Sequence, residues 1–186
     1  YIIYNLYIDI EMVILSASEF REMENDRMID GIQGLTQELN LQSSRGFGHE
    51  TSGNTVETSL NNNEYIGYLL INNRVAASGF SRLDGTNKTM YIHSISVSAE
   101  FRGQGLCKKL TGEFIKKFGN HILYLTVRTE PGSENISGIK CYEKSGFIML
   151  SEVYRDHYDG KNNAMIRLPN NKKKKNKRTR KRIKQK

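Results

Sequence analysis

The chain has 186 residues, 37% of them hydrophobic, a length that allows one domain with a sizeable core. Its net charge of +8 is uneven, because residues 170–186 hold eleven of the 28 Lys and Arg and none of the 20 Asp and Glu. The tail therefore carries +11, whereas residues 1–169 carry −3. This distribution excludes a uniformly basic protein. It predicts a mildly acidic domain at 12–169 and a disordered basic tail at 170–186.

The N-terminal residues 1–11 are apolar but too few to cross a bilayer, and they lack a basic region and a small-residue cleavage site. They form either an extra strand or an upstream extension. Without a signal-peptide pattern and with only two cysteines, the sequence predicts a reducing, intracellular setting, cytoplasmic or nuclear, and no membrane span.

The first predicted elements are a short strand at 12–15 and a helix capped by Ser16 or Ser18. A second helix is predicted at 31–41, where apolar residues recur at helical spacing. Residues 42–63 are rich in Ser, Gly, Asn and Thr and predict a long loop with room for one short helix.

Strands dominate the middle of the chain. Segments 65–71 and 75–80 predict a hairpin, and Asp84-Gly85 marks the next turn before a strand at 90–97. The helix predicted next, 106–118, places its apolar residues on one face, and these are Leu106, Leu110, Phe114 and Phe118.

The C-terminal part of the domain completes the sheet. The almost wholly apolar run 122–127 predicts a strand covered on both faces, and a helix follows near Asn135, capped by Ser133 or Ser137. Strands at 147–154 and 164–168 come last. Together these elements predict a mixed α/β sheet with helices on both sides.

A glycine-rich turn lies between the strand at 90–97 and the helix at 106–118, and it reads Arg102-Gly103-Gln104-Gly105-Leu106-Cys107. Such a turn leaves backbone N–H groups directed at one point, where the positive end of the helix dipole also acts. It therefore predicts a phosphate site, with positive charge added by Arg102, Lys108 and Lys109. A plain strand-to-helix connection with solvated lysines is the alternative.

A second segment, Asn135-Ile-Ser-Gly138-Ile-Lys-Cys-Tyr142, precedes Gly146-Phe147. The two segments together resemble the GNAT superfamily of acetyl-CoA-dependent N-acetyltransferases, over about residues 64–168 and more weakly back to 12. The family patterns are Gln/Arg-x-x-Gly-x-Gly/Ala and Asn-x-x-Ala-x-x-x-Tyr followed by Gly-Phe. Cys107 and Gly138 replace small residues of these patterns.

The resemblance implies a mostly antiparallel sheet of about six to seven strands with about four helices, and acetyl-CoA as cosubstrate. The glycine-rich turn would hold the coenzyme A diphosphate. The backbone of the strand at 90–97 would pair with the pantetheine arm, which would lie alongside it as an added strand. The loop at 42–63 would border the acceptor site. The residues implied to contact the cosubstrate are Ile95, Ser96, Val97, Arg102, Gly103, Gln104, Gly105, Leu106, Cys107, Lys108, Asn135 and Tyr142.

Tyr142 and His93 are the predicted catalytic residues. By resemblance Tyr142 stands near the thioester sulfur, where a phenol can act as general acid toward the leaving thiolate; a packed core tyrosine is the alternative. His93 is the predicted general base because imidazole titrates near neutral pH. Strict alternation, however, would bury His93 on the strand face of Ile95 and Val97, as a core histidine. Weaker candidates for the base are Tyr91, Glu130, Glu134 and Glu64.

Cys107 and Cys141 are predicted to be structural, since neither has a histidine and a carboxylate beside it in the sequence. The spacing of Cys and His predicts no metal. The tail 172–186 resembles a nuclear localisation signal and would bind nucleic acid or acidic partners without sequence preference, because it has no aromatic residue; a merely solubilising tail is the alternative.

The predicted function is acetyl transfer from acetyl-CoA directly to a primary amine. The alternative is a catalytically weak or inactive coenzyme A-binding fold that acts through its tail. The acidic body favours a cationic acceptor: a polyamine, an aminoglycoside-like amine, or a lysine or N-terminus of a basic protein.

Overall fold

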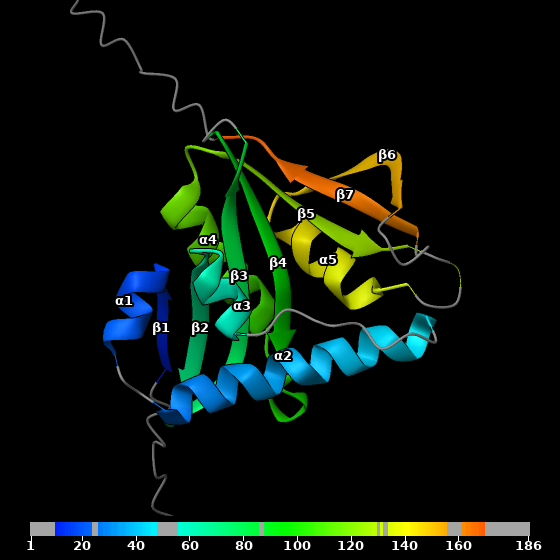
Figure 1. Ribbon diagram of the computed structural model, residues 1–186. Coiled ribbons are helices and arrows are strands. Elements are labelled where there is room, and N and C mark those ends of the chain that lie inside the picture. Colours follow the sequence, from blue (N-terminus) through cyan, green and yellow to red (C-terminus); the bar gives the residue numbers. More distant parts are fainter. Residues whose placement is uncertain are drawn as a thin grey trace, which may run out of the picture.

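The computed structural model describes residues 10–23, 26–47, 56–85, 88–129, 131, 134–155 and 161–169. Seven described strands form one sheet in the order β1-β2-β3-β4-β5-β7-β6 (Figure 1). They are β1 Ile10–Leu15, β2 Tyr65–Ile71, β3 Arg74–Asp84, β4 Thr89–Val97, β5 Ile122–Arg128, β6 Ile148–Arg155 and β7 Lys161–Arg167. All neighbouring strands are antiparallel except β4 and β5. The predicted fold class is therefore confirmed.

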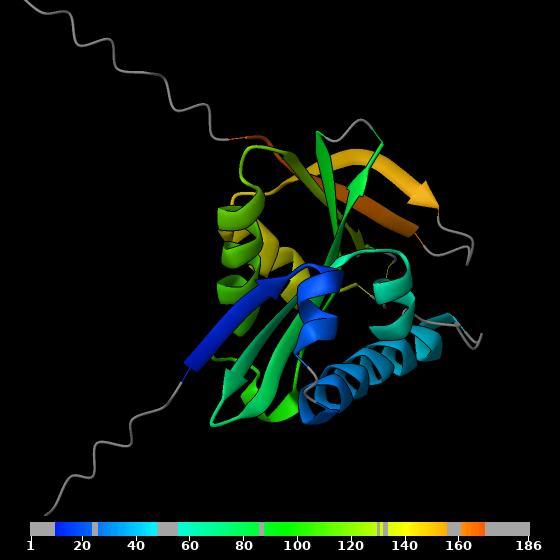
Figure 2. The ribbon, with the colours of Figure 1, turned by 60° about the vertical axis from the view of Figure 1, so that its left-hand side comes forward.

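The described residues form five α-helices and one short 3-10 helix, and the α-helices cover both faces of the sheet (Figure 2). They are α1 Ala17–Glu22, α2 Asp26–Phe47, α3 Val56–Asn61, α4 Leu106–Phe118 and α5 Ile136–Lys144, with the 3-10 turn at Ala99–Phe101. Ser16 caps α1 in a capping box with Glu19, as one of the two predicted caps.

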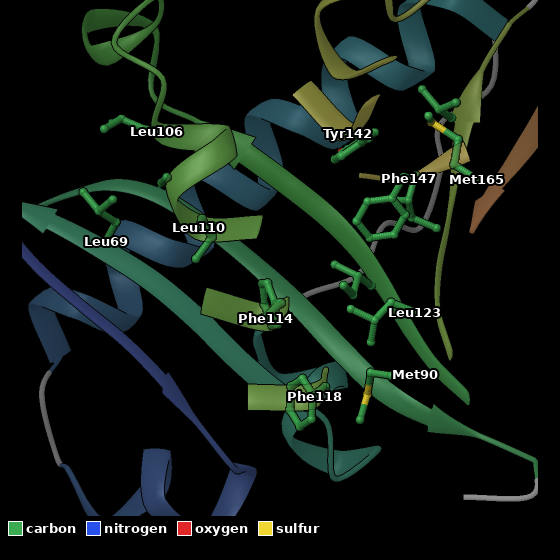
Figure 3. Close-up of a cluster of buried hydrophobic side chains, with 14 of the residues drawn as sticks. Leu69, Met90, Leu106, Leu110, Phe114, Phe118, Leu123, Tyr142, Phe147 and Met165 are labelled. Carbon is green, nitrogen blue, oxygen red and sulfur yellow. The ribbon is translucent and has the colours of Figure 1, made fainter. Parts of the chain in front are cut away.

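Two apolar clusters fill the space between the helices and the sheet. The larger one joins α4 to the sheet through Leu110, Phe114 and Phe118, and it also includes Tyr142 and Phe147 from the α5 side (Figure 3). The other lies beneath α1, α2 and α3, where Phe20, Ile32 and Phe80 are buried. The position of α4 and its buried face match the prediction, because its apolar residues recur at the spacing of a helix face.

The sequence underestimated the helices before β2. The loop predicted at 42–63 is wrong at its start, because α2 runs on to Phe47, whereas α3 at Val56–Asn61 is the one short helix for which the prediction left room. Polar residues obscured the end of α2, since a helix that covers a sheet with one face needs few apolar positions. The part of the predicted loop between these helices, 48–55, lies outside the described residues, as do residues 1–9.

The strands β4 and β5 part after a short ladder. Their parallel pairing spans Thr89–Tyr91 against Ile122–Tyr124, and in the described strands it ends there. Figure 1 shows the two strands diverging beyond this point, with α5 at the gap. The strand β5 was predicted to be covered on both faces, but its burial alternates, with Tyr124 and Thr126 only half-buried. The buried residues Leu123, Leu125 and Val127 belong to the larger apolar cluster, so one face of β5 is covered and the prediction is wrong for the other.

A β-bulge interrupts β4. Phe80 pairs with His93 and Ser78 with Ser96, so two steps along β3 match three along β4. Ser94 takes a positive φ of 52° at this point. The bulge shifts the alternation, so Ile95 and Val97 pack with the α4 cluster, whereas His93 stacks on Phe80 in the opposite cluster. The prediction that His93 shares the face of Ile95 and Val97 is therefore wrong.

Candidate active site

A cavity of about 710 Å³ lies where β4 leaves β5, at the start of α4 and alongside α5. Its size is in the range of sites for small molecules and cofactors. Eleven of the twelve residues implied to contact the cosubstrate line it, and Gln104 is the exception among the described residues. Seven further residues line it, which are Leu39, Phe101, Ser137, Gly138, Lys140, Cys141 and Lys144.

The glycine turn forms one end of the cavity. Gly103 and Gly105 have φ of 78° and 75°, in the left-handed region that disfavours residues with a Cβ. A Cβ built on either glycine meets no described atom within 4 Å, so both glycines border open space. Gly105 is the N-cap of α4, whose first turn contains no acidic residue. The unpaired amides and the helix dipole therefore act together on an anion in this space.

Arg102 has a different position from the one expected. Its Nη2 donates to Glu38 on α2 at 2.8 Å, and its Nε donates to the Val97 carbonyl at 3.2 Å. The guanidinium thus joins α2, β4 and the glycine turn, and the carboxylate offsets much of its charge. The backbone amides and Lys108, which lines the cavity, are left as the main positive groups on this wall.

Asn135 is the N-cap of α5, and its Oδ1 accepts a hydrogen bond from the Gly138 N–H at 2.9 Å. The prediction that Ser137 caps this helix is wrong, and Ser133 lies outside the described residues. A Cβ on Gly138 would come within 2.6 Å of Asn135 Nδ2. Glycine at this position therefore accommodates the capping amide, and it also lines the cavity.

Tyr142 lies on α5, where it lines the cavity and belongs to the larger apolar cluster. Figure 3 shows it among the residues of that cluster. Its ring makes an edge contact with Phe147 at 6.2 Å between centroids. Burial, with a smaller contribution from the Tyr91 phenol, raises the pKa of Tyr142 to about 12. The hydroxyl is therefore protonated at neutral pH and can donate a hydrogen bond into the cavity.

Cys107 and Cys141 form a disulfide that joins the first turn of α4 to α5. Both residues line the cavity, so the bond ties two of its walls together. The sequence predicted structural cysteines but not their pairing. They are 34 residues apart in the chain, and only the packing of α4 against α5 brings them together.

His93 lies outside the cavity lining, in a buried cluster behind β4. Its Nε2 is 3.1 Å from Glu64 Oε2, and Arg82 approaches the other oxygen of Glu64 at 3.5 Å. The imidazole stacks on Phe80 and on Tyr91. Burial alone would raise the pKa of Glu64, but the hydrogen bond and charge of His93, with help from Arg82, hold that pKa below its ordinary value.

Tyr91 connects the His93 cluster to the cavity side. It stacks on both His93 and Tyr124, and its hydroxyl bonds Thr126 on β5 at 3.1 Å. Its phenol is also near enough to Tyr142 to influence that group's pKa. Tyr91 is therefore near both predicted catalytic residues, His93 and Tyr142.

The Acetyltransferase (GNAT) family model matches residues 18–147. The chain belongs to this family. Together with the cavity at the glycine turn, this match confirms the family resemblance of the two sequence segments. One curated relative, an uncharacterised protein of Mycobacterium leprae, is 34% identical over 86 residues, a match that spans 46% of this chain and 23% of that protein.

Solved structures share the fold at low sequence identity. A putative acetyltransferase of Acinetobacter baylyi superposes with a TM-score of 0.63 and 15% identity, covering 86% of this chain and 94% of its own. The ribosomal-protein-S18-alanine N-acetyltransferase of Escherichia coli gives 0.54 and 20%, covering 84% and 91%. The spermidine N-acetyltransferase of Vibrio cholerae, solved with CoA and spermine, gives 0.59 and 13%, covering 84% and 95%.

None of the helices in the described part of the chain has the length and apolar character needed to span a membrane. Within the same residues, His, Cys, Asp and Glu side chains do not gather in groups of three or more that would hold a metal ion.

Proposed function

We propose that the protein is an acetyl-CoA-dependent N-acetyltransferase that moves the acetyl group directly to a primary amine. One observation carries the proposal: a cavity of about 710 Å³ joins the left-handed glycine turn at the start of α4 to the phenol of Tyr142. The glycine turn can bind an anion, and the Tyr142 phenol can donate a hydrogen bond. A cavity with both features suits a ligand that carries phosphate groups and a thioester.

Successive parts of the cavity wall suit successive parts of acetyl-CoA, from the diphosphate to the thioester. The amides of Gly103 to Lys108 would hold the diphosphate, where any side chain at 103 or 105 would intrude. The backbone of Ile95 to Val97, beyond the end of the β4–β5 ladder, would pair with the pantetheine arm. The acetyl thioester would then lie near Tyr142, and bound acetyl-CoA supplies the activated acyl group.

Tyr142 acts on the departing sulfur. A phenol with a pKa of about 12 is a far weaker acid than a thiol with a pKa of about 8.5. Full proton transfer from the phenol to a thiolate would cost roughly 5 kcal/mol. This cost favours a role for Tyr142 as a hydrogen-bond donor that stabilises the thiolate over the role of general acid that the sequence suggested.

The acceptor amine must lose a proton before it attacks. For a lysine-like amine with a pKa of about 10.4, reaching the neutral form at pH 7 costs about 4.6 kcal/mol. His93 is the proposed base, because its imidazole lies on β4 next to the bulge at which the strand turns toward the cavity. The other candidates are less suited: Glu64 is the partner of His93, Glu134 is exposed, and Glu130 lies outside the described residues.

The acceptor is proposed to be cationic, in keeping with the charge of −3 on residues 1–169. Structural neighbours named for a ribosomal protein alanine and for spermidine support an amine acceptor, on a protein or on a small molecule. The tail 172–186 lies outside the described residues. Its roles in nuclear import or in binding nucleic acid stay proposals.

Release of free thiol from acetyl-CoA tests the proposal directly. The full chain is given polyamines, aminoglycosides and lysine or N-terminal peptides, and at least one acceptor should raise the initial rate well above hydrolysis. A chain truncated after Pro169 should keep this rate on a small amine. Failure of every acceptor, together with strong salt-dependent binding of RNA or DNA, would favour the alternative of a binding protein that acts through its tail.

A further inference from the structure

Three polar side chains, two from β4 and one from the residue before β2, form a continuous hydrogen-bonded chain. Glu64 Oε2 is 3.1 Å from His93 Nε2, and His93 Nδ1 is 3.2 Å from the hydroxyl of Ser94. Glu64 is 1% exposed and His93 8%, whereas Ser94 is only half-buried. The chain therefore runs from the protein interior to a partly open residue of β4.

The carboxylate fixes which nitrogen of His93 carries the proton. Since Glu64 is ionised at neutral pH, it accepts hydrogen bonds and cannot donate one. A neutral imidazole beside it is stable only with the proton on Nε2, because two lone pairs would otherwise face each other. The Nδ1 lone pair then points to Ser94, whose hydroxyl is left to donate.

The bulge gives Ser94 its position. A serine at a φ of 52° is in the left-handed region, which residues with a Cβ adopt only at a cost in free energy. Ser94 immediately precedes Ile95, which lines the cavity. It lies beyond Tyr91, the last residue of β4 that pairs with β5. The strained residue is therefore at the point where the sheet opens.

Resting on the proposed function, we infer that Glu64, His93 and Ser94 form a proton relay, in which the Ser94 hydroxyl takes the proton of the acceptor ammonium. The hydroxyl proton moves to His93 Nδ1 while an ammonium proton moves to the Ser94 oxygen. The products are a neutral amine, an intact serine and an imidazolium, so charge and protons balance. The imidazolium is stabilised by the carboxylate of Glu64.

This relay explains how a buried histidine can serve an acceptor that does not touch it. Phe80 and Tyr91 cover the two faces of the imidazole, and Glu64 occupies Nε2. Arg82 approaches Glu64, lies over the Tyr91 ring and adds a positive charge to the cluster. Of the hydrogen bonds that join His93 to Glu64 and to Ser94, the one to the Ser94 hydroxyl leads to the less buried residue. Glu64 acts through His93 and is a positioning residue.

Ser94→Gly is the decisive variant, because glycine removes the hydroxyl and also relieves the strained φ. Its kcat near pH 7 should fall at least about tenfold, with the KM for acetyl-CoA little changed, whereas its Tm should be equal or higher. A lysine-like amine is roughly 300-fold more often neutral at pH 9.5 than at pH 7, so the deficit should shrink as pH rises. A purely structural role would not give that convergence.

Ser81→Ala is the matched control, since it deletes a buried hydroxyl on β3 that has no partner in the described part of the chain. It should leave the rate unchanged. Glu64→Gln should lower kcat, and Glu113→Gln, on α4, should not. Histidine 15N NMR reads the tautomer of His93 without any activity: the unvaried protein should show Nε2–H, and Glu64→Gln should lose that preference.

The outcomes separate the relay from the function on which it rests. If the unvaried protein releases no thiol with any amine, the proposed function fails, whatever the NMR shows. If it is active and Ser94→Gly keeps its rate at all pH values, the relay is overturned. A deficit that stays constant from pH 7 to 9.5, or a Nδ1–H tautomer in the active protein, would also overturn it.

Discussion

Reduction of the disulfide between Cys107 and Cys141 is expected to destabilise the domain and weaken its cosubstrate site together. The bond closes a segment of 34 residues. In the chain-entropy account, a disulfide that closes a loop of this size restricts the unfolded chain. It thereby stabilises the folded state relative to the unfolded state by about 4 kcal/mol. For a chain of this length that corresponds to a fall in Tm of roughly 8 to 15 °C.

Thermal unfolding with and without a phosphine reductant measures this effect. The double variant Cys107→Ala/Cys141→Ala is the control, because its Tm should be low and should not respond to reductant. Both cysteines line the cavity between α4 and α5, so reduction should also raise the KM for acetyl-CoA severalfold. Two titratable thiols in the native protein before reduction, or a Tm that reductant leaves unchanged, would refute the reasoning.

Three further predictions follow from single residues. Tyr142→Phe should slow thiol release at least severalfold with little change in Tm, since it removes the donor and keeps the ring; an unchanged rate would contradict the role of the phenol. Gly138→Ala should displace the Asn135 cap and lower the stability by about 1 kcal/mol in thermal unfolding, whereas Gly112→Ala, where a Cβ has open space among the described residues, should not destabilise. Because the pKa of Glu64 is lowered on folding, its ionised form stabilises the protein above the ordinary value of 4.5, and this stabilisation is lost as pH falls through the lowered folded pKa. The difference in unfolding free energy between the protein and Glu64→Gln should therefore shrink in acid, and a constant difference would count against the buried carboxylate.

Local patterns predicted the elements that position the cavity. The helix at 106–118 and the hairpin turn at Asn72 and Asn73 follow from helical spacing and from residues that tolerate positive φ, which both asparagines adopt. The glycine turn could be placed because Gly103 and Gly105 stand between a predicted strand and a predicted helix, where glycine permits a tight turn. These features depend on neighbours within a few residues.

What the sequence left open depends on distant contacts. The bulge at Ser94 places the side chains of His93 and Ile95 on opposite faces of the sheet. Residue spacing does not predict a bulge, since any residue type can occupy one. Glu64 and His93 are 29 residues apart, and they meet only because β2, β3 and β4 lie side by side. Leu39 likewise reaches the cavity through a distant contact, because α2 packs against β3 and β4.

The central claim is that the cavity at the start of α4 binds acetyl-CoA. Calorimetric titration of the folded, full chain with acetyl-CoA tests it most directly, with Gly105→Ala as the variant whose Cβ would enter the left-handed turn. We predict a saturable heat for one site per chain, much weakened in Gly105→Ala. The absence of heat at millimolar acetyl-CoA, or equal binding by the variant, would contradict it.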